Sequence, residues 1–279
     1  MLKDLLAPIT RTEGDDNALD TALTLAGLEG AHLAVLVTVE LPAPIASEWG
    51  AFPAGVYSNL YQEARGRGEE LAAGLRTRLA RTPVTTEVRV VDALYLQTSR
   101  SAALHARHAD LTLITGPIDG EARAAVESLF VDLLMDSGRP VLVVPPAHVV
   151  ELPAQRVVIA WQPTREASRA VHDAIPFLCA AESIDVLLID PQVGEAAHGE
   201  EPGADIATHL ARHGLRVRVV TQPDMGQSVA TAILHHAHQT GAQMLVAGGY
   251  SHSRFREQIL GGVTRELLQA AHLPVLFSH

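Results

Sequence analysis

The chain alternates between short apolar runs and longer stretches in which apolar residues recur at helical spacing. The short runs are typical of strands buried on both faces of a sheet, and the longer stretches are typical of amphipathic helices. In the N-terminal half this pattern predicts strands at 5–10, 32–40, 88–91, 111–115 and 141–144, and helices at 19–26, 60–79, 98–108 and 122–135. Residues 42–57 follow no single period and contain several prolines, so they are predicted to form a long loop.

The C-terminal half shows the same order of elements. Its predicted strands are 157–161, 184–189, 217–220, 244–247 and 275–277, and its predicted helices are 167–178, 205–213, 229–238 and 265–271. Because strands and helices alternate in each half, the strands are expected to lie parallel in sheets that helices cover. The predicted fold class is therefore α/β, with two repeated doubly wound parallel-sheet sandwich domains.

Short stretches of sequence also repeat between the two halves. Val-Arg-Val-Val at residues 88–91 returns at residues 217–220, and such internal similarity indicates a duplicated unit. We therefore predict one domain over residues 1–147 and a second over residues 153–279, with a short proline-bracketed linker between them. A single continuous sheet, or halves that do not superpose, would contradict this interpretation.

Charge and composition narrow the possible partners. The formal net charge is -11, and basic residues are not clustered, so a nucleic-acid partner is not expected. The apolar run at residues 31–39 is too short to span a bilayer, and the first residues lack the apolar run of a signal peptide. We therefore expect a cytoplasmic protein with no membrane partner. The single cysteine, Cys179, cannot form an intrachain disulfide and is expected to be buried.

A glycine-rich loop after the predicted strand at residues 244–247 is the most informative candidate site. It begins at Gly248 and ends at the pair Gly261 and Gly262, which lead into a predicted helix. Glycines let a ligand approach the backbone closely, and the N-terminus of a helix favours an anion. Ligands of open parallel sheets also lie beyond the carboxyl ends of the strands. The loop is therefore a candidate phosphate site, and the alternative is an ordinary strand-to-helix connection.

The same loop resembles the nucleotide-binding loop of universal stress proteins, which carries the pattern Gly-x2-Gly-x9-Gly-[Ser/Thr]. In this frame the four positions are Gly248, Ser251, Gly261 and Gly262. Two of these four positions match the pattern, and the runs at residues 160–167, 252–257 and 262–268 also look like segments of that family. The resemblance covers the chain as two copies. It implies a tandem universal stress protein with an adenine nucleotide alpha hydrolase-like fold.

The resemblance also implies which residues contact a nucleotide. Gln162 stands where the family tends to have an Asp near the base and ribose, and an amide can still donate and accept hydrogen bonds. The backbone near Ile189, at the end of the second strand, would face the adenine. Two residues weaken the phosphate site, because Ser251 adds a side chain and Gly262 lacks a hydroxyl. The implied nucleotide-binding residues are Gln162, Ile189, Gly248, Ser251, Gly261 and Gly262.

The first copy departs further from the family pattern. Thr10 stands at the position of Gln162, and Glu127 stands at the position of Gly261. A carboxylate at that position would repel a phosphate. If a nucleotide site exists, we expect it in the C-terminal domain.

Three functions stay open at this point. The first is a binding or regulatory module of universal stress type that holds ATP or a related adenine nucleotide, with the need for Mg²⁺ undecided. The second is an interaction protein that has lost nucleotide binding in both copies. The third is a weak nucleotide hydrolase, for which the sequence offers no group that activates water.

No catalytic residue and no metal site are predicted. His209 and His213 are spaced to share a helix face, but no third ligand is evident. Ser251 and Ser253 lie beside His252 but lack the glycine-flanked turn of a nucleophilic serine.

The resemblance further implies how the two copies meet. In the family's strand order the last strand of each copy lies at a sheet edge, where its backbone groups are unpaired. Pairing of the two edge strands would cover both, and the chain would then be a pseudo-dimer that can pair again as a homodimer.

Overall fold

The fold is described from a computed structural model. The structure describes residues 1–41, 46–47, 50–51, 54–94, 98–120, 122–191, 201–250 and 262–279. The predicted site residues Ser251 and Gly261 lie outside the described residues, as do His252, Ser253 and part of the predicted loop at residues 42–57.

The N-terminal half follows the predicted order of elements. Its elements are β1 (Asp4–Pro8), α1 (Asp15–Glu29), β2 (His32–Leu41), β3 (Ala46–Ser47), β4 (Gly50–Ala51), α2 (Ala54–Leu79), β5 (Thr86–Leu94), α3 (Thr98–Ala106), β6 (Leu111–Thr115), α4 (Arg123–Asp136) and β7 (Val141–Val144). Residues 54–57 belong to α2, so the predicted loop is too long at this end. Pro53 stands just before the helix, where a proline interrupts no helical hydrogen bond. The short strands β3 and β4 were not predicted.

The C-terminal half also follows the predicted order. Its elements are β8 (Arg156–Ala160), α5 (Arg165–Leu178), β9 (Ser183–Ile189), α6 (Ala204–Arg212), β10 (Val217–Gln222), α7 (Val229–Thr240), β11 (Met244–Gly248), α8 (Gly262–Ala270) and β12 (Val275–Ser278). Helix α8 begins earlier than predicted, so Gly262 is its first residue. Cys179 directly follows α5 and is exposed, so the expectation of a buried cysteine is wrong. The buried face of α5 carries Val171, Ala174 and Leu178 at helical spacing, and position 179 turns away from that face.

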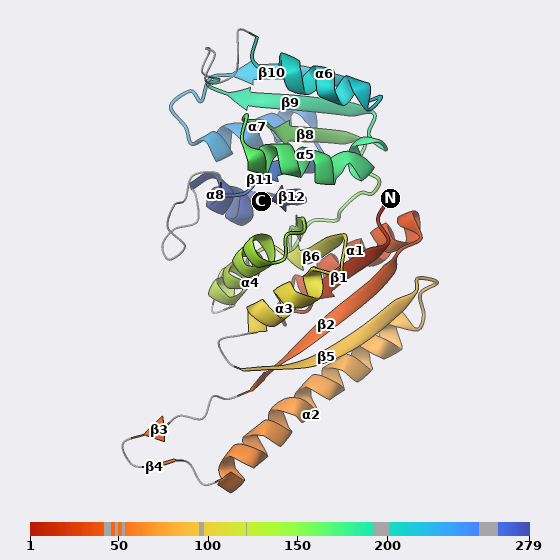
Figure 1. The fold of residues 1–279 in the computed structure, drawn as a ribbon, viewed down its shortest axis with the longest axis vertical. Coiled ribbons are helices and arrows are strands. Elements are labelled where there is room, and N and C mark those ends of the chain that lie inside the picture. The colour runs from red at the N-terminus through yellow and green to blue at the C-terminus, as the bar shows by residue number, and fades with distance from the viewer. Residues whose placement is uncertain are drawn as a thin grey trace.

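Ten strands form one sheet, in the order β10-β9-β8-β11-β12-β7-β6-β1-β2-β5. Within each half all neighbouring strands are parallel, and the strand order of one half mirrors that of the other. The halves join where β12 pairs with β7 in antiparallel register, with Leu276 opposite Leu142. Figure 1 shows the two halves one above the other along the long axis of the molecule.

This continuous sheet corrects the expectation that duplication would give separate sheets. The sheet is continuous because the last strand of each half pairs with the other, which is the edge pairing that the family resemblance implies. Two copies joined in this way necessarily share one sheet. The same strand order on both sides of the joint supports the duplication.

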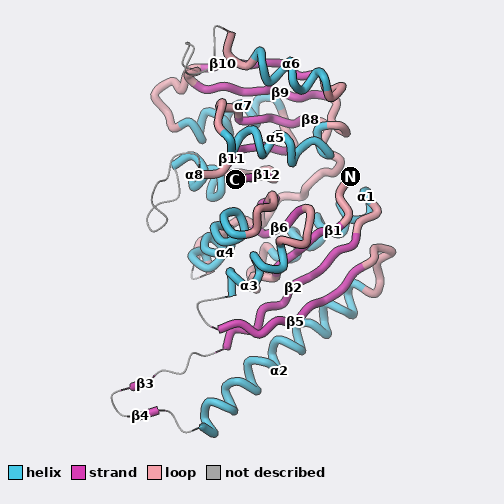
Figure 2. The backbone as a smooth tube through the Cα atoms, viewed as in Figure 1, coloured by secondary structure: helices cyan, strands magenta, loops and turns pink. Residues whose placement is uncertain are grey.

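Helices cover both faces of the sheet, as Figure 2 shows for the backbone. One buried apolar cluster lies between the sheet and helices α1, α2, α5 and α6, and a second lies between the sheet and helices α3, α4, α7 and α8. Each cluster contains residues of both halves, so the two halves share their core across the joint. Within the described ranges, none of the helices combines the length and apolar character that crossing a bilayer requires.

Aromatic rings strengthen the joint between the halves. Phe130 on α4 packs edge-to-face on Phe277 of β12, with ring centres 5.1 Å apart, and stacks at 6.4 Å on Tyr250, which follows β11. Near these rings the Gln269 amide of α8 donates a hydrogen bond of 2.8 Å to Glu127 of α4. The end of β11 is therefore held by the other half of the chain.

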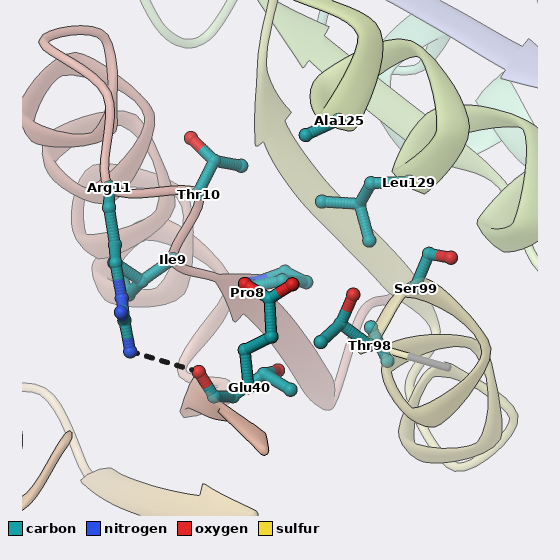
Figure 3. A pocket seen from close by; sticks show the side chains of 11 residues that line it. Pro8, Ile9, Thr10, Arg11, Glu40, Thr98, Ser99, Ala125 and Leu129 are labelled. Atoms are coloured by element: carbon teal, nitrogen blue, oxygen red, sulfur yellow. Dashed lines mark hydrogen bonds between the residues drawn. The ribbon is translucent and has the colours of Figure 1, made fainter. Parts of the chain in front are cut away.

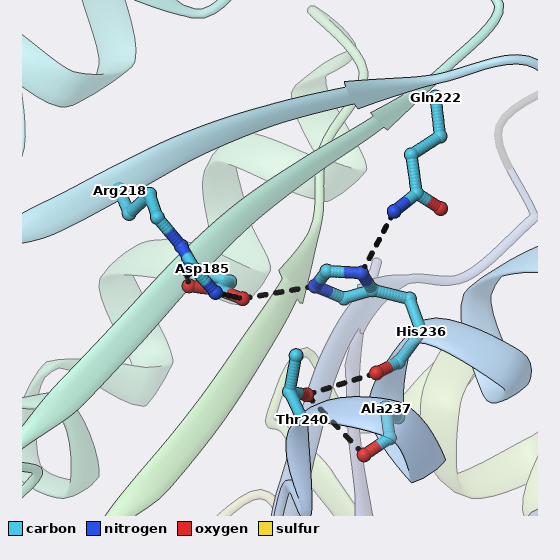
Figure 4. A network of polar contacts seen from close by, with 6 residues as sticks. All are labelled: Asp185, Arg218, Gln222, His236, Ala237 and Thr240. Atoms are coloured by element: carbon cyan, nitrogen blue, oxygen red, sulfur yellow. Dashed lines mark hydrogen bonds and ion pairs between the residues drawn. The ribbon is translucent and has the colours of Figure 1, made fainter.

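A buried polar network ties β9 and β10 to α7 (Figure 4). Asp185 on β9 is almost fully buried and accepts two hydrogen bonds from the guanidinium of Arg218 on β10. Its Oδ2 also lies 2.9 Å from Nε2 of His236 on α7, and the other ring nitrogen of His236 meets Gln222 at 3.0 Å. Burial opposes ionisation of Asp185, but the hydrogen bonds from Arg218 and His236 outweigh it and lower the pKa of Asp185.

We predict that Asp185→Asn lowers the free energy of unfolding by about 1–3 kcal/mol at pH 7, because the charge-assisted bonds are lost. The lowered folded-state pKa stabilises the protein above the ordinary Asp pKa of about 4, and this contribution disappears as the pH falls through the folded-state pKa. Urea unfolding at pH 7 and pH 3 measures both effects. The exposed Asp20, which pairs with Arg78, provides the control variant Asp20→Asn, for which a change below about 0.5 kcal/mol is expected. A deficit for Asp185→Asn that is equal at the two pH values would contradict the prediction.

Candidate functional site

A cavity of about 300 Å³ lies at the carboxyl ends of β8, β9 and β11, between these strands and helices α5, α7 and α8. This is the edge of a parallel sheet at which ligands bind in folds of this kind. The cavity is lined by Ala160, Trp161, Gln162, Thr164, Ala167, Leu187, Ile189, Val229, Ile233, Ala247, Gly248, Val263, Thr264 and Leu267.

The structure brings three of the predicted site residues together. Gln162, Ile189 and Gly248 all line the cavity, each at or just beyond the end of a different strand. Gly262 is exposed at the start of α8 and does not itself line the cavity, although the next two residues do. Ser251 and Gly261 lie outside the described residues. Of the four positions of the predicted glycine pattern, the structure therefore describes only Gly248 and Gly262.

Gly248 has a packing role that the motif did not indicate. A Cβ atom at this position would lie 2.5 Å from the backbone nitrogen of Ala167 and 2.7 Å from the carbonyl carbon of Glu166. Both are backbone atoms of the first turn of α5, so the helix itself would have to shift to make room for a side chain. Gly248 is therefore required for the close approach of α5 to β11, whether or not a ligand is bound.

One wall of the cavity is apolar. Leu187 and Ile189 project from β9 on the same face of the sheet, and Val229 and Ile233 face them from α7. None of the lining residues within the described part of the chain carries a formal charge. Such a wall suits an uncharged ring system, whereas a buried ion would lack a partner there.

The polar end of the cavity is formed by helix N-termini. Thr164 is the N-cap of α5, and its hydroxyl accepts a hydrogen bond from the backbone nitrogen of Ala167 at 3.2 Å. Thr264, in the first turn of α8, accepts from the backbone nitrogen of Tyr250 at 3.2 Å. The first N–H groups of a helix and its dipole favour an anion, so negative charge is accommodated at this end.

Thr164 and Thr264 were not among the predicted site residues. Thr164 could have been found, because a threonine directly before an amphipathic stretch is a typical N-cap. Thr264 had no comparable signal, since its contact with Tyr250 depends on how the loop between them closes.

A smaller cavity of about 150 Å³ occupies the corresponding place in the N-terminal half, at the ends of β1 and β2 (Figure 3). The register makes Thr38 of β2 the counterpart of Ile189 of β9, since Leu33 pairs with Leu5 as Ile184 pairs with Val157. In this cavity Arg11 donates a hydrogen bond of 3.1 Å to the carbonyl oxygen of Thr38. The backbone position that the resemblance assigns to adenine is thus already occupied by a side chain of the protein.

The loop that carries Arg11 is itself held in place. Asp15, at the start of α1, accepts hydrogen bonds from the backbone nitrogens of Thr10, Arg11 and Thr12 and from the Thr10 hydroxyl at 2.6 Å. Arg11 has a φ of 61°, a conformation uncommon for a residue with a side chain. These bonds compensate for the strain and keep the guanidinium over the cavity.

Glu127 does not act as the sequence indicated. It was expected to repel phosphate in the first copy, but it does not line the N-terminal cavity. Instead its carboxylate pairs with Arg123 one turn away and accepts from Gln269 of the other half. Helix α4 is longer than α8, and position 127 therefore lies inside the helix and not at its start.

The comparisons with known proteins agree with this architecture. Residues 154–279 match the model of the Universal stress protein family. A search of curated proteins gives no match.

Over its whole length the chain has the same fold as solved structures that include a universal stress protein. A universal stress protein from Archaeoglobus fulgidus DSM 4304 superposes with a TM-score of 0.71 at 14% identity, covering 99% of this chain and 95% of that protein. A functionally unknown protein from Pseudomonas aeruginosa PAO1 superposes with a TM-score of 0.60 at 16% identity, covering 99% and 92%. The predicted family resemblance and the predicted α/β fold class are confirmed.

We predict that Gly248→Ala destabilises the protein by about 1–3 kcal/mol, because the added methyl group collides with the backbone of α5. Gly262→Ala is the matched control, since a Cβ there has no neighbour within 4 Å among the described residues. Its expected change is below about 0.5 kcal/mol. Thermal unfolding of both variants checks the prediction, and equal Tm values for Gly248→Ala and the wild type would refute it.

Proposed function

We propose that the protein is a binding or regulatory module of universal stress type, whose C-terminal domain, residues 153–279, holds ATP or a related adenine nucleotide. The N-terminal domain, residues 1–147, does not bind the nucleotide in this proposal. The observation that carries it is the cavity at the ends of β8, β9 and β11, which has an apolar wall and helix N-termini at its polar end.

The two ends of the cavity suit the two parts of a nucleotide. The apolar wall of Leu187, Ile189, Val229 and Ile233 accommodates the adenine ring, which gains from desolvation and dispersion contacts. The phosphates lie toward the start of α8, where backbone N–H groups are available for anions. Gln162 stands beside the cavity with an amide that can bond to the ribose.

The size of the cavity fits this assignment. Its volume of about 300 Å³ lies at the lower end of the roughly 300–1,000 Å³ of small-molecule sites. The base and ribose would be enclosed, and the phosphates would extend toward solvent. Binding through the base explains how a site tolerates the loss of the hydroxyl at Gly262.

The two alternatives have less support. An interaction protein without a ligand does not account for the larger apolar-walled cavity in one half and the smaller cavity with a bonded Thr38 carbonyl in the other. A hydrolase requires a group that activates water, and no acidic or histidine side chain lines the C-terminal cavity within the described ranges. A cytoplasmic location and a homodimer are further parts of the proposal, and they are supported by the family resemblance alone.

We predict that Val229→Trp weakens the binding of ATP or AMP about tenfold or more, because the indole fills the space for the base. Val229 and Thr98 are the first residues of α7 and α3, are both half-buried and line the two corresponding cavities. Thr98→Trp is therefore a matched control that should leave the affinity unchanged.

Isothermal titration of the wild type and both variants with each nucleotide checks this prediction. No saturable binding by the wild type would overturn the proposed function. If Thr98→Trp weakens nucleotide binding and Val229→Trp does not, the site lies in the N-terminal half and the proposed location is wrong.

A further inference from the structure

Three histidines meet on the outer surface of the C-terminal half, away from the nucleotide cavity. His172 lies on α5, His209 lies in the last turn of α6, and His213 follows that helix directly. Helices α5 and α6 pack on the same face of the sheet (Figures 1 and 2), which brings a residue of α5 beside two residues at the end of α6. The sequence showed no third ligand beside His209 and His213, and the structure places His172 next to them.

Two of the three ring separations are those of imidazoles that share a metal ion. Two imidazoles bound to one tetrahedral ion, with metal–nitrogen bonds of about 2.0–2.1 Å, have ring centres about 5 Å apart. The ring centres of His209 and His213 are 4.9 Å apart, and those of His172 and His209 are 5.2 Å apart. The third separation, between His172 and His213, is 6.3 Å.

One nitrogen of the cluster lacks a partner. Nε2 of His209 is buried and has no hydrogen-bond partner among the described residues. An unpartnered buried nitrogen costs free energy, so its presence calls for a group that satisfies it. The rings of His172 and His213 lie against the His209 ring, and both residues are exposed, so they are free to turn toward a ligand that this nitrogen binds.

We propose that His172, His209 and His213 form a surface site for a late first-row divalent metal ion such as Zn²⁺, which clips α6 to α5. Neutral imidazoles are the ligands that such ions prefer, and a histidine pair one helical turn apart chelates an ion on one helix face. Among the described residues, no group of three His, Cys, Asp or Glu side chains is already arranged to hold a metal ion. Binding therefore includes a turn of the exposed His172 and His213 rings that closes the 6.3 Å separation.

The site is independent of the proposed nucleotide function. It lies on the face of the sheet covered by α5 and α6, whereas the apolar wall of the nucleotide cavity belongs to the face covered by α7. A metal that joins α5 and α6 stabilises the folded state, because the ligands are gathered only there.

The test uses tag-free, full-length protein and Zn²⁺ or Co²⁺ alone. The wild type is expected to bind one ion, to show the visible absorption of tetrahedral Co²⁺, and to gain Tm with Zn²⁺ in a way that a chelator reverses. The double variant His172→Ala/His213→Ala changes two exposed residues, and it is expected to lose about tenfold or more in affinity.

A second histidine group supplies the control. His148 and His238 are also exposed and flank His272, with ring centres 6.3 Å and 5.8 Å from it. The variant His148→Ala/His238→Ala should bind as the wild type does. Three results would each overturn the proposal. They are an equal loss of affinity in the two double variants, wild-type affinity in His172→Ala/His213→Ala, and the absence of tight metal binding by the wild type.

Discussion

The antiparallel pairing of β7 with β12 is the interaction on which the rest of the structure depends. Each of these strands is the last of its half and would otherwise expose unpaired backbone groups at a sheet edge. Pairing satisfies both edges at once and joins two five-membered sets of parallel strands into one sheet. Phe130 and Phe277 then pack across the joint, so the hydrogen-bonded ladder and the apolar core reinforce each other.

The same pairing separates the two cavities. Because β7 and β12 run in opposite directions, the strands of one half point opposite to the strands of the other half. The carboxyl ends of the two sets of strands therefore face in opposite directions. One set of ends carries the smaller cavity, in which Arg11 bonds the Thr38 carbonyl, and the other carries the larger cavity with the apolar wall. Both copies contribute to the joint, so the divergence between them is concentrated at their cavities. Tyr250, which follows β11, stacks on Phe130 of the other half. This contact connects the end of β11, which borders the C-terminal cavity, to the joint between the halves.

Much of this arrangement could be predicted from the sequence. Short apolar runs such as residues 111–115 predict buried strands, and the structure has a strand at these residues. Gly248 could be placed at the cavity because ligands of parallel sheets lie beyond the carboxyl ends of the strands, and Ile189 could be placed there because the family resemblance implied it. The hydrogen bond from Arg11 to the Thr38 carbonyl could not be predicted, because it requires a positive φ and a contact between two different strand ends. The contact of His172 with His209 was equally hidden, since it depends on how two helices lie on the sheet.

Hydrogen–deuterium exchange of the full-length protein, with and without ATP or AMP, tests the central claim most directly. Amide exchange reports protection wherever a ligand holds the backbone, and it reads both halves of the chain in one experiment. The account predicts slower exchange in peptides that cover residues 158–164, 186–190 and 229–234, with no change at residues 8–12 and 36–40. Protection confined to the N-terminal peptides, or none at saturating nucleotide, would contradict it.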